Sequence, residues 1–128
     1  MKPYTDIDGL ADIVLEESWV LGLTATPDQL LLPVDFVLTA SHPLYQPPAA
    51  DTIECTRRGQ LRFGAVTSLQ WTGQGAPPAR DKTGEIDYGH IDSFEWKPGC
   101  YRLEGDWGFM DVTGGAVQVT IDDTGGSA

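Results

Sequence analysis

Apolar and polar residues alternate along most of this chain, and the alternation predicts an antiparallel β protein. The clearest case is 61–71, where Leu61, Phe63, Leu69 and Trp71 share one parity and Arg62 lies among the polar residues between them. A period of two is typical of a strand that buries one face and leaves the other in water. No segment has the apolar spacing of an amphipathic helix of three turns, so we expect no helix longer than that.

Turn signals divide the chain into about seven strands. The expected strands are 13–24, 30–39, 52–56, 61–71, 86–96, 101–112 and 117–121, with a hairpin turn at 57–60. Pro98-Gly99 suits a type II turn, since Pro presets φ and Gly supplies a positive φ. The parity of the first strand is interrupted near 16–18, which indicates a bulge or an exposed strand end. Pro33 cannot donate to a ladder, so the second strand is expected at an edge or with a bulge.

These strands fit one all-β domain over residues 1–128, a single antiparallel β-sandwich or partly open barrel of about seven strands. Residues 1–10 are expected to form a loose lead-in and residues 122–128 a flexible tail, with long loops at 40–51 and 72–85. The alternation predicts that the following residues are mostly buried: Leu30, Leu32, Phe36, Leu61, Phe63, Leu69, Trp71, Leu103 and Val119.

Charge changes this picture because it is large and uneven. The net charge is −11, and residues 1–56 hold nine acids against the single base Lys2, whereas residues 57–128 hold ten acids against seven bases. Such a field repels nucleic acid and anionic membranes and attracts cationic partners. We therefore expect a protein partner with a basic surface, contacted by four carboxylates on or beside the first hairpin: Glu16, Glu17, Asp28 and Asp35. The alternative is that the acidity only keeps the protein soluble.

Targeting signals are not evident in the sequence. No apolar run approaches the roughly 18 residues of a membrane span, and the first residues lack the apolar region of a signal peptide. A cytoplasmic protein is therefore expected. Cys55 and Cys100 lie in predicted strands without CxxC spacing, which favours small buried thiols over a disulfide or a nucleophile.

One stretch gathers side chains that can carry chemistry. Tyr88, His90 and Asp92 would share one face of a strand, where His90 could act as a base or, with His42, ligate a metal. No spacing specifies such a metal site, so we expect no metal and no cofactor. The alternatives are a small-ligand site or an ordinary polar strand face.

The Gly105-Asp-Trp-Gly108 motif indicates a bulge or a close approach of another backbone. Trp107 could then be a stacking platform for a carbohydrate. In the structural alternative, Trp107 is a core residue whose indole N–H needs an acceptor, and Asp106 marks a tight turn.

The segment Phe94-Glu-Trp-Lys-Pro-Gly-Cys-Tyr-Arg-Leu-Glu-Gly-Asp-Trp-Gly-Phe-Met-Asp-Val112 resembles small acidic all-β bacterial domains of uncharacterised or toxin-immunity type. The resemblance implies a non-enzymatic binding protein with no catalytic residues. Three functions follow in order: a protein-binding domain that acts through an acidic surface, a small-ligand or carbohydrate-binding domain, and an enzyme of unknown class.

Overall fold

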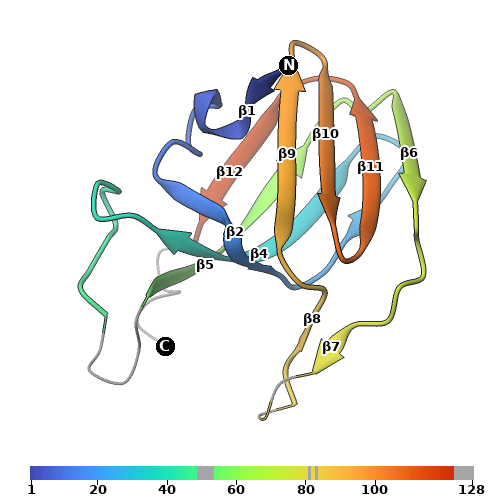
Figure 1. Cartoon of the computed structure of the whole chain (residues 1–128). Helices are drawn as coiled ribbons and strands as arrows, with labels where there is room; N and C mark the ends of the chain where they lie inside the picture. Colours follow the sequence, from blue (N-terminus) through green and yellow to red (C-terminus); the bar gives the residue numbers. More distant parts are fainter. Residues whose placement is uncertain (49–53, 81, 83, 123–128) are drawn as a thin grey trace.

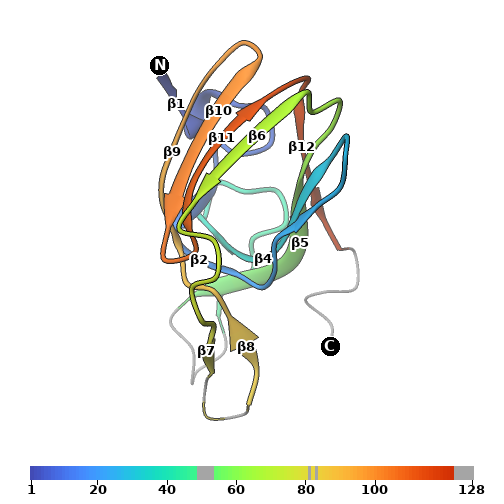
Figure 2. The same cartoon turned by 90° about the vertical axis from the view of Figure 1, so that its right-hand side faces the viewer.

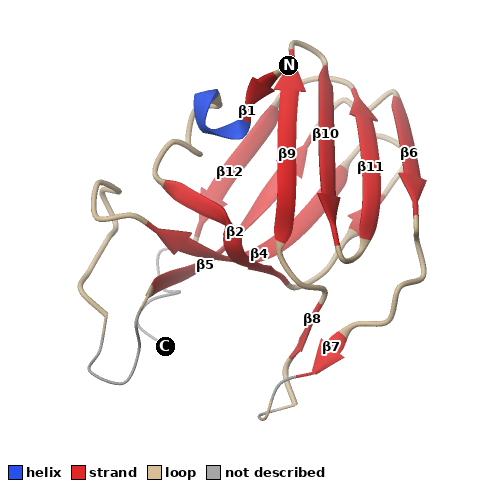
Figure 3. Ribbon diagram, viewed as in Figure 1, coloured by secondary structure: helices blue, strands red, loops and turns tan. Residues whose placement is uncertain are grey.

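The computed structural model describes residues 1–48, 54–80, 82 and 84–122, and this part of the chain is all-β (Figure 3). Its one helical element is a short 3-10 turn, η1 (Tyr4–Asp6), so the expectation of no long helix is confirmed for these residues. The strands are β1 (Lys2–Pro3), β2 (Ile13–Val20), β3 (Thr24–Ala25), β4 (Leu30–Leu38), β5 (Cys55–Phe63), β6 (Ser68–Thr72), β7 (Ala79–Arg80), β8 (Ile86–Asp87), β9 (Ile91–Lys97), β10 (Cys100–Gly105), β11 (Gly108–Thr113) and β12 (Val117–Ile121).

Two five-stranded antiparallel sheets form the body of the molecule (Figures 1 and 2). Sheet A has the order β1-β9-β10-β11-β6; sheet B has the order β12-β5-β4-β2, with β3 also beside β4. Phe63 of sheet B lies 5.4 Å from Tyr101 and 6.1 Å from Phe94 of sheet A, between ring centroids. The two sheets therefore share one core, an arrangement consistent with a sandwich and not closed into a barrel.

The strand count differs from the sequence prediction. Twelve strands lie within the described residues, against the seven expected. Four of them, β1, β3, β7 and β8, are only two residues long. Such short pairings are too brief to carry a periodic pattern. The hairpin β7–β8 includes part of 72–85, which the sequence predicts as a loop.

The predicted hairpin turn at 57–60 is wrong, because β5 runs straight through it as a nine-residue strand. Gly59 is needed there for close packing. A Cβ on Gly59 would lie 2.1 Å from the Thr120 carbonyl oxygen and 2.9 Å from the Phe36 ring. A glycine inside a strand often marks such a close approach.

The predicted strand 61–71 is also broken, into the end of β5 and the whole of β6, which belong to different sheets. The chain turns between them at Ala65, whose φ is +50°. Both sheets face the same core, so Phe63 and Leu69 both pack toward it. The alternation of buried positions is interrupted at the corner itself, where Ala65 and Thr67 are exposed and Val66 packs against the core.

Pro33 does not mark an edge. Its strand β4 lies between β5 on one side and β2 and β3 on the other. The Pro33 carbonyl accepts a hydrogen bond from Leu21 N (2.8 Å). The Pro33 ring lies next to Gly22, where an added Cβ would be in van der Waals contact with it. Pro33 thus faces the gap between β2 and β3, where no ladder donor is needed.

Several local predictions are confirmed. The register of β2 against β4 shifts between Val14 and Trp19, which is the expected bulge. Pro98 and Gly99 join β9 to β10, and Gly99 has φ +79°.

The close approach expected at the Gly105–Gly108 motif is also present, since a Cβ on Gly108 would lie 2.2 Å from the Thr72 carbonyl oxygen. The predicted strand 101–112 is wrong, however, because Asp106 and Trp107 form a two-residue hairpin turn that divides it into β10 and β11.

Residues 1–10 are not a loose lead-in. β1 pairs with β9, and Tyr4, Ile7 and Leu10 are buried in the core. These three apolar residues are three positions apart, so they do not follow the period of two that predicts a strand. Of the predicted tail, Asp122 donates its N–H to the Arg58 carbonyl (2.8 Å), and 123–128 lie outside the described residues.

Most of the predicted core is confirmed. Six of its members are buried: Leu30, Leu32, Phe36, Leu61, Phe63 and Leu103. Leu69, Trp71 and Val119 are half-buried and pack against that core.

Candidate binding face

The outer side of sheet B carries two adjoining cavities, which together we call the acidic face. Thr56 of β5 pairs with Val37 of β4; Thr56 lines the first cavity and Val37 the second. Loop 39–45 lies at one end of the face and the β7–β8 hairpin at the other (Figure 1). The face is therefore assembled from β2, β4, β5 and two connecting segments.

The first cavity, the Trp19 cavity, has a volume of about 340 Å³ and is lined by Trp19, Leu21, Asp35, Thr56, Glu85 and Asp87. Trp19 is 41% exposed, unusually high for a tryptophan. It lies directly across the ladder from Asp35. The His90 ring packs on Trp19 with centroids 4.0 Å apart and a tilt of 43°.

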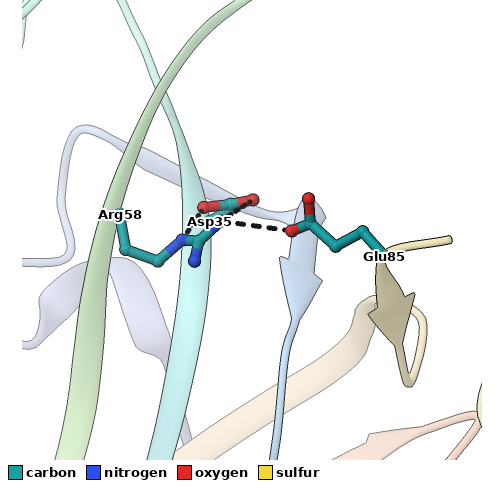
Figure 4. A network of polar contacts seen from close by, with 3 residues as sticks. All are labelled: Asp35, Arg58 and Glu85. Atoms are coloured by element: carbon teal, nitrogen blue, oxygen red, sulfur yellow. Dashed lines mark hydrogen bonds and ion pairs between the residues drawn. The ribbon is translucent and has the colours of Figure 1, made fainter. Parts of the chain in front are cut away.

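An arginine bridges two carboxylates of this cavity (Figure 4). Arg58 of β5 donates from Nε to Asp35 Oδ1 (2.5 Å) and from Nη2 to Asp35 Oδ2 (3.3 Å). The same Nη2 donates to Glu85 Oε1 (3.1 Å), which holds the segment before β8 near sheet B. The hydrogen bond to Asp35 is the main reason that the pKa of Arg58 is raised, with burial acting against it.

The second cavity, the Tyr45 cavity, has a volume of about 440 Å³. It is lined by Val14, Glu17, Val37, Leu38, Ala40, Tyr45, Glu54 and Cys55. Loop 39–45 closes it through successive turns in which His42 N donates to Thr39 O and Tyr45 N to His42 O (both 3.0 Å). Its floor is apolar and its rim carries Glu17 and Glu54.

The acidic face has an excess of carboxylates. Among the described residues, five carboxylates line the two cavities, and Arg58, on the same side of β5 as Thr56, bridges two of them. On the outer side of sheet A, Glu95, Arg102 and Asp111 follow one another across β9, β10 and β11. There Arg102 Nε lies 3.0 Å from Asp111 Oδ1. The excess of carboxylates is therefore larger at the two cavities of sheet B than along this row of sheet A.

The four carboxylates predicted to contact a partner do not form one group. Asp35 and Glu17 lie on the acidic face. Glu16 instead accepts a hydrogen bond from the Tyr4 hydroxyl (2.6 Å). Asp28 lies in the turn between β3 and β4 and accepts from the Thr26 hydroxyl (3.3 Å). Glu16 and Glu17, although adjacent in β2, therefore contact different parts of the molecule.

Glu16 has a structural role through Tyr4. The Tyr4 hydroxyl also accepts from Leu15 N (3.2 Å), so it joins the N-terminal segment to β2. Burial, together with the hydrogen bond to Glu16, raises the pKa of Tyr4 to about 12.

The expected shared strand face of Tyr88, His90 and Asp92 is wrong. Gly89 has φ +87°, which breaks the extended backbone between β8 and β9. His90 turns toward β2, where its Nδ1 lies 2.7 Å from the Ser18 carbonyl. A carbonyl only accepts, so Nδ1 is the donor. Asp92 lies in β9 with an exposed side chain.

Tyr88 and Trp107 do come together, in a third cavity. It measures about 270 Å³ and is lined by Leu23, Trp71, Gln74, Gly75, Ala76, Tyr88 and Trp107. Trp107 is only 2% exposed, so the stacking-platform hypothesis is wrong and the core alternative is confirmed. Its indole N–H donates to the His90 carbonyl (3.2 Å). The half-buried rings here are Tyr88 and Trp71.

Metal ligation, thiols and membrane spans can each be checked within the described residues. No three His, Cys, Asp or Glu side chains there gather into a group able to hold a metal ion. Cys55 is buried, Cys100 is half-buried, and both are free thiols. No helix in the described ranges is long and apolar enough to span a membrane.

Sequence reasoning missed Trp19, Glu54, Glu85 and Asp87 as members of the acidic face. The bulge was the available signal for Trp19. Four residues of β2 (15–18) lie opposite one residue of β4 (36), and such an odd shift of three moves the following side chains to the opposite face. Nothing in the sequence brings Glu85 near Asp35, because that contact depends on where the β7–β8 hairpin lies.

Comparison of the chain with protein-family models, with curated proteins and with solved structures finds no match.

Proposed function

We propose that this domain is a β-sandwich that binds, without catalysis, a protein partner with a basic surface, and that the partner docks on the acidic face of sheet B. One observation carries the proposal: the described residues lining two adjoining cavities include an exposed tryptophan and five carboxylates, of which Arg58 pairs with two. An immunity-type role, in which the domain covers a basic partner, is the form that the sequence resemblance implies.

The composition of the face supports binding rather than mere solubility. A solubilising surface mixes both signs, and the row across sheet A has Arg102 between two carboxylates, Glu95 and Asp111. The described residues of the acidic face instead gather five carboxylates, two of them paired with Arg58. Binding interfaces combine complementary charge with a central aromatic anchor. Trp19 lies between Asp35 and His90 and supplies such an anchor.

A peptide titration tests the proposal. Hexa-arginine, added to isotope-labelled protein, should shift backbone amide resonances of Trp19, Asp35, Thr56 and Glu54, with little change in β9 to β11. The affinity should fall steeply between about 0.05 M and about 0.3 M salt, because screening shortens over that range. Hexaglutamate is the matched control and should cause no shifts. Shifts spread over both sheets, or an affinity that ignores salt, would contradict the proposal.

The third cavity favours a small-ligand function as a second candidate. Tyr88 and Trp71 border it together with the amide of Gln74, a combination of aromatic rings and a polar group that suits a small ligand such as a carbohydrate. Binding there would be insensitive to salt and would shift the Trp71 and Tyr88 resonances instead of those on the acidic face.

A further inference from the structure

We propose that the Trp19 cavity is the socket for an arginine side chain of the partner. This inference rests on the proposed function and adds the chemistry of the anchor: a guanidinium that stacks on Trp19 and donates hydrogen bonds to Asp87.

The first step is that the carboxylates of this cavity already suit a guanidinium. Arg58 donates to Asp35 from two nitrogens and to Glu85 from one of them. A planar fork of donors matches carboxylates in this way, whereas an ammonium group acts as a point charge. Arg58 is therefore an example, within the protein itself, of the guanidinium–carboxylate pairing that we propose for the partner's arginine.

The second step is that Trp19 offers a stacking surface. His90 packs on its ring at 4.0 Å, and the hydrogen bond from His90 Nδ1 to Ser18 O (2.7 Å) fixes that imidazole. The indole is thus held in place while 41% of Trp19 stays exposed. A guanidinium gains both cation–π attraction and planar stacking on an indole.

The third step is that Asp87 keeps acceptor capacity. Its Oδ1 accepts from Gly89 N (2.8 Å), which orients the carboxylate at the end of β8. A carboxylate offers about four acceptor positions, so one such bond leaves room for a second donor. Leu21, which also lines the cavity, suits the apolar stem of an arginine.

The test compares hexa-arginine with hexa-lysine on wild-type protein and on the Trp19→Leu variant. Wild-type protein should bind hexa-arginine more tightly, with a shift of the Trp19 indole N–H resonance. Trp19→Leu should weaken hexa-arginine binding about fivefold and hexa-lysine binding less. Trp96→Leu, which removes a half-buried tryptophan from sheet A, is the matched control and should change neither affinity.

The outcomes separate this inference from the proposed function. If hexa-arginine shifts the Glu54 and Thr56 amides but not the Trp19 indole, or if Trp19→Leu binds it as tightly as wild-type protein, the arginine socket is wrong and the acidic face stands. If neither peptide shifts the acidic face, both proposals fail. The indole measurement uses wild-type protein, so it decides the matter even where a variant is poorly folded.

Discussion

At the scale of single residues, Ser18 organises the bulge that exposes Trp19. Ser18 is fully buried; its Oγ donates to the Val14 carbonyl (2.7 Å) and accepts from Val37 N (2.9 Å). The Ser18 side chain thus provides hydrogen bonds where the extra residues of β2 interrupt the ladder with β4. A buried backbone group without a partner costs roughly 1–3 kcal/mol, so this bridge is what makes the bulge tolerable.

The same bulge explains why Trp19 was not predictable as a site residue. The alternation places Ile13, Leu15 and Trp19 on one parity, which predicts a core position for all three. Leu15 is buried, but the buried positions then change to Ser18 and Val20. The sequence indicates that a bulge exists near 16–18, yet it does not say which side chains follow the change of face.

Tyr4 makes the stability of the fold depend on pH in the alkaline range. Its folded-state pKa of about 12 lies above the ordinary value of 10.0, so above pH 10 the unfolded chain loses its proton first. Stability that Tyr4 contributes is therefore complete below about pH 10 and is lost as the pH rises toward about 12.

The comparison of wild-type protein with Tyr4→Phe measures this effect. At neutral pH the variant should lose about 1–2 kcal/mol in the free energy of unfolding, because Leu15 N and Glu16 lose their partner. Urea unfolding at about pH 8 and about pH 11 should show that difference shrinking at the higher pH. An unchanged difference would mean that the Tyr4 hydroxyl is not held as described.

At the scale of elements, β5 is continuous because Gly59 lets β12 and Phe36 approach it closely. Gly59→Ala should destabilise the domain by about 2 kcal/mol or more, since the added Cβ meets the Thr120 carbonyl at 2.1 Å. Gly64→Ala is the matched control, because there the nearest atom to a Cβ lies 3.9 Å away, on Arg62.

Urea unfolding of both variants checks this. A loss of stability in Gly59→Ala but not in Gly64→Ala would support a continuous strand β5 through Gly59. Equal effects would favour the hairpin turn that the sequence predicts at 57–60.

The elements with strong local chemistry could be predicted, and those set by distant contacts could not. Pro98-Gly99 marks the hairpin between β9 and β10, because a tight turn needs particular residues at particular positions. The hairpin at Gly105–Gly108 was not predicted, because the apolar pattern of 101–112 does not show where the chain reverses. The pairing of β1 with β9 joins Lys2 to Trp96, and no local pattern announces a partner that far along the chain.

At the scale of the whole molecule, the all-β class follows from the alternation of apolar and polar residues. The arrangement into two sheets depends on the places where the chain turns from one sheet into the other. The chain passes from sheet B to sheet A at 64–67 and returns after β11, so β6 and β12 lie in different sheets from their chain neighbours β5 and β11. In the sequence, the alternation of apolar and polar residues runs through the first corner. A pattern with period two therefore does not reveal where that corner lies.

The acidic face is also a property of the whole molecule. The sequence shows the excess of acids in residues 1–56, and Glu17, Asp35 and Glu54 come from that part. Glu85 and Asp87 come from the other part and join them through the β7–β8 hairpin and the Arg58 bridge. The charge asymmetry was therefore visible in the sequence, but the face that carries it was not.

The central claim is that binding resides on the acidic face and does not follow from total charge. Two double variants separate these explanations: Glu17→Lys with Glu54→Lys on the acidic face, and Glu95→Lys with Glu104→Lys on sheet A. Both raise the net charge from −11 to −7. The affinity for hexa-arginine should fall about tenfold or more in the first and by less than about twofold in the second. Equal losses of affinity in the two variants would show that binding follows total charge and does not reside on the acidic face.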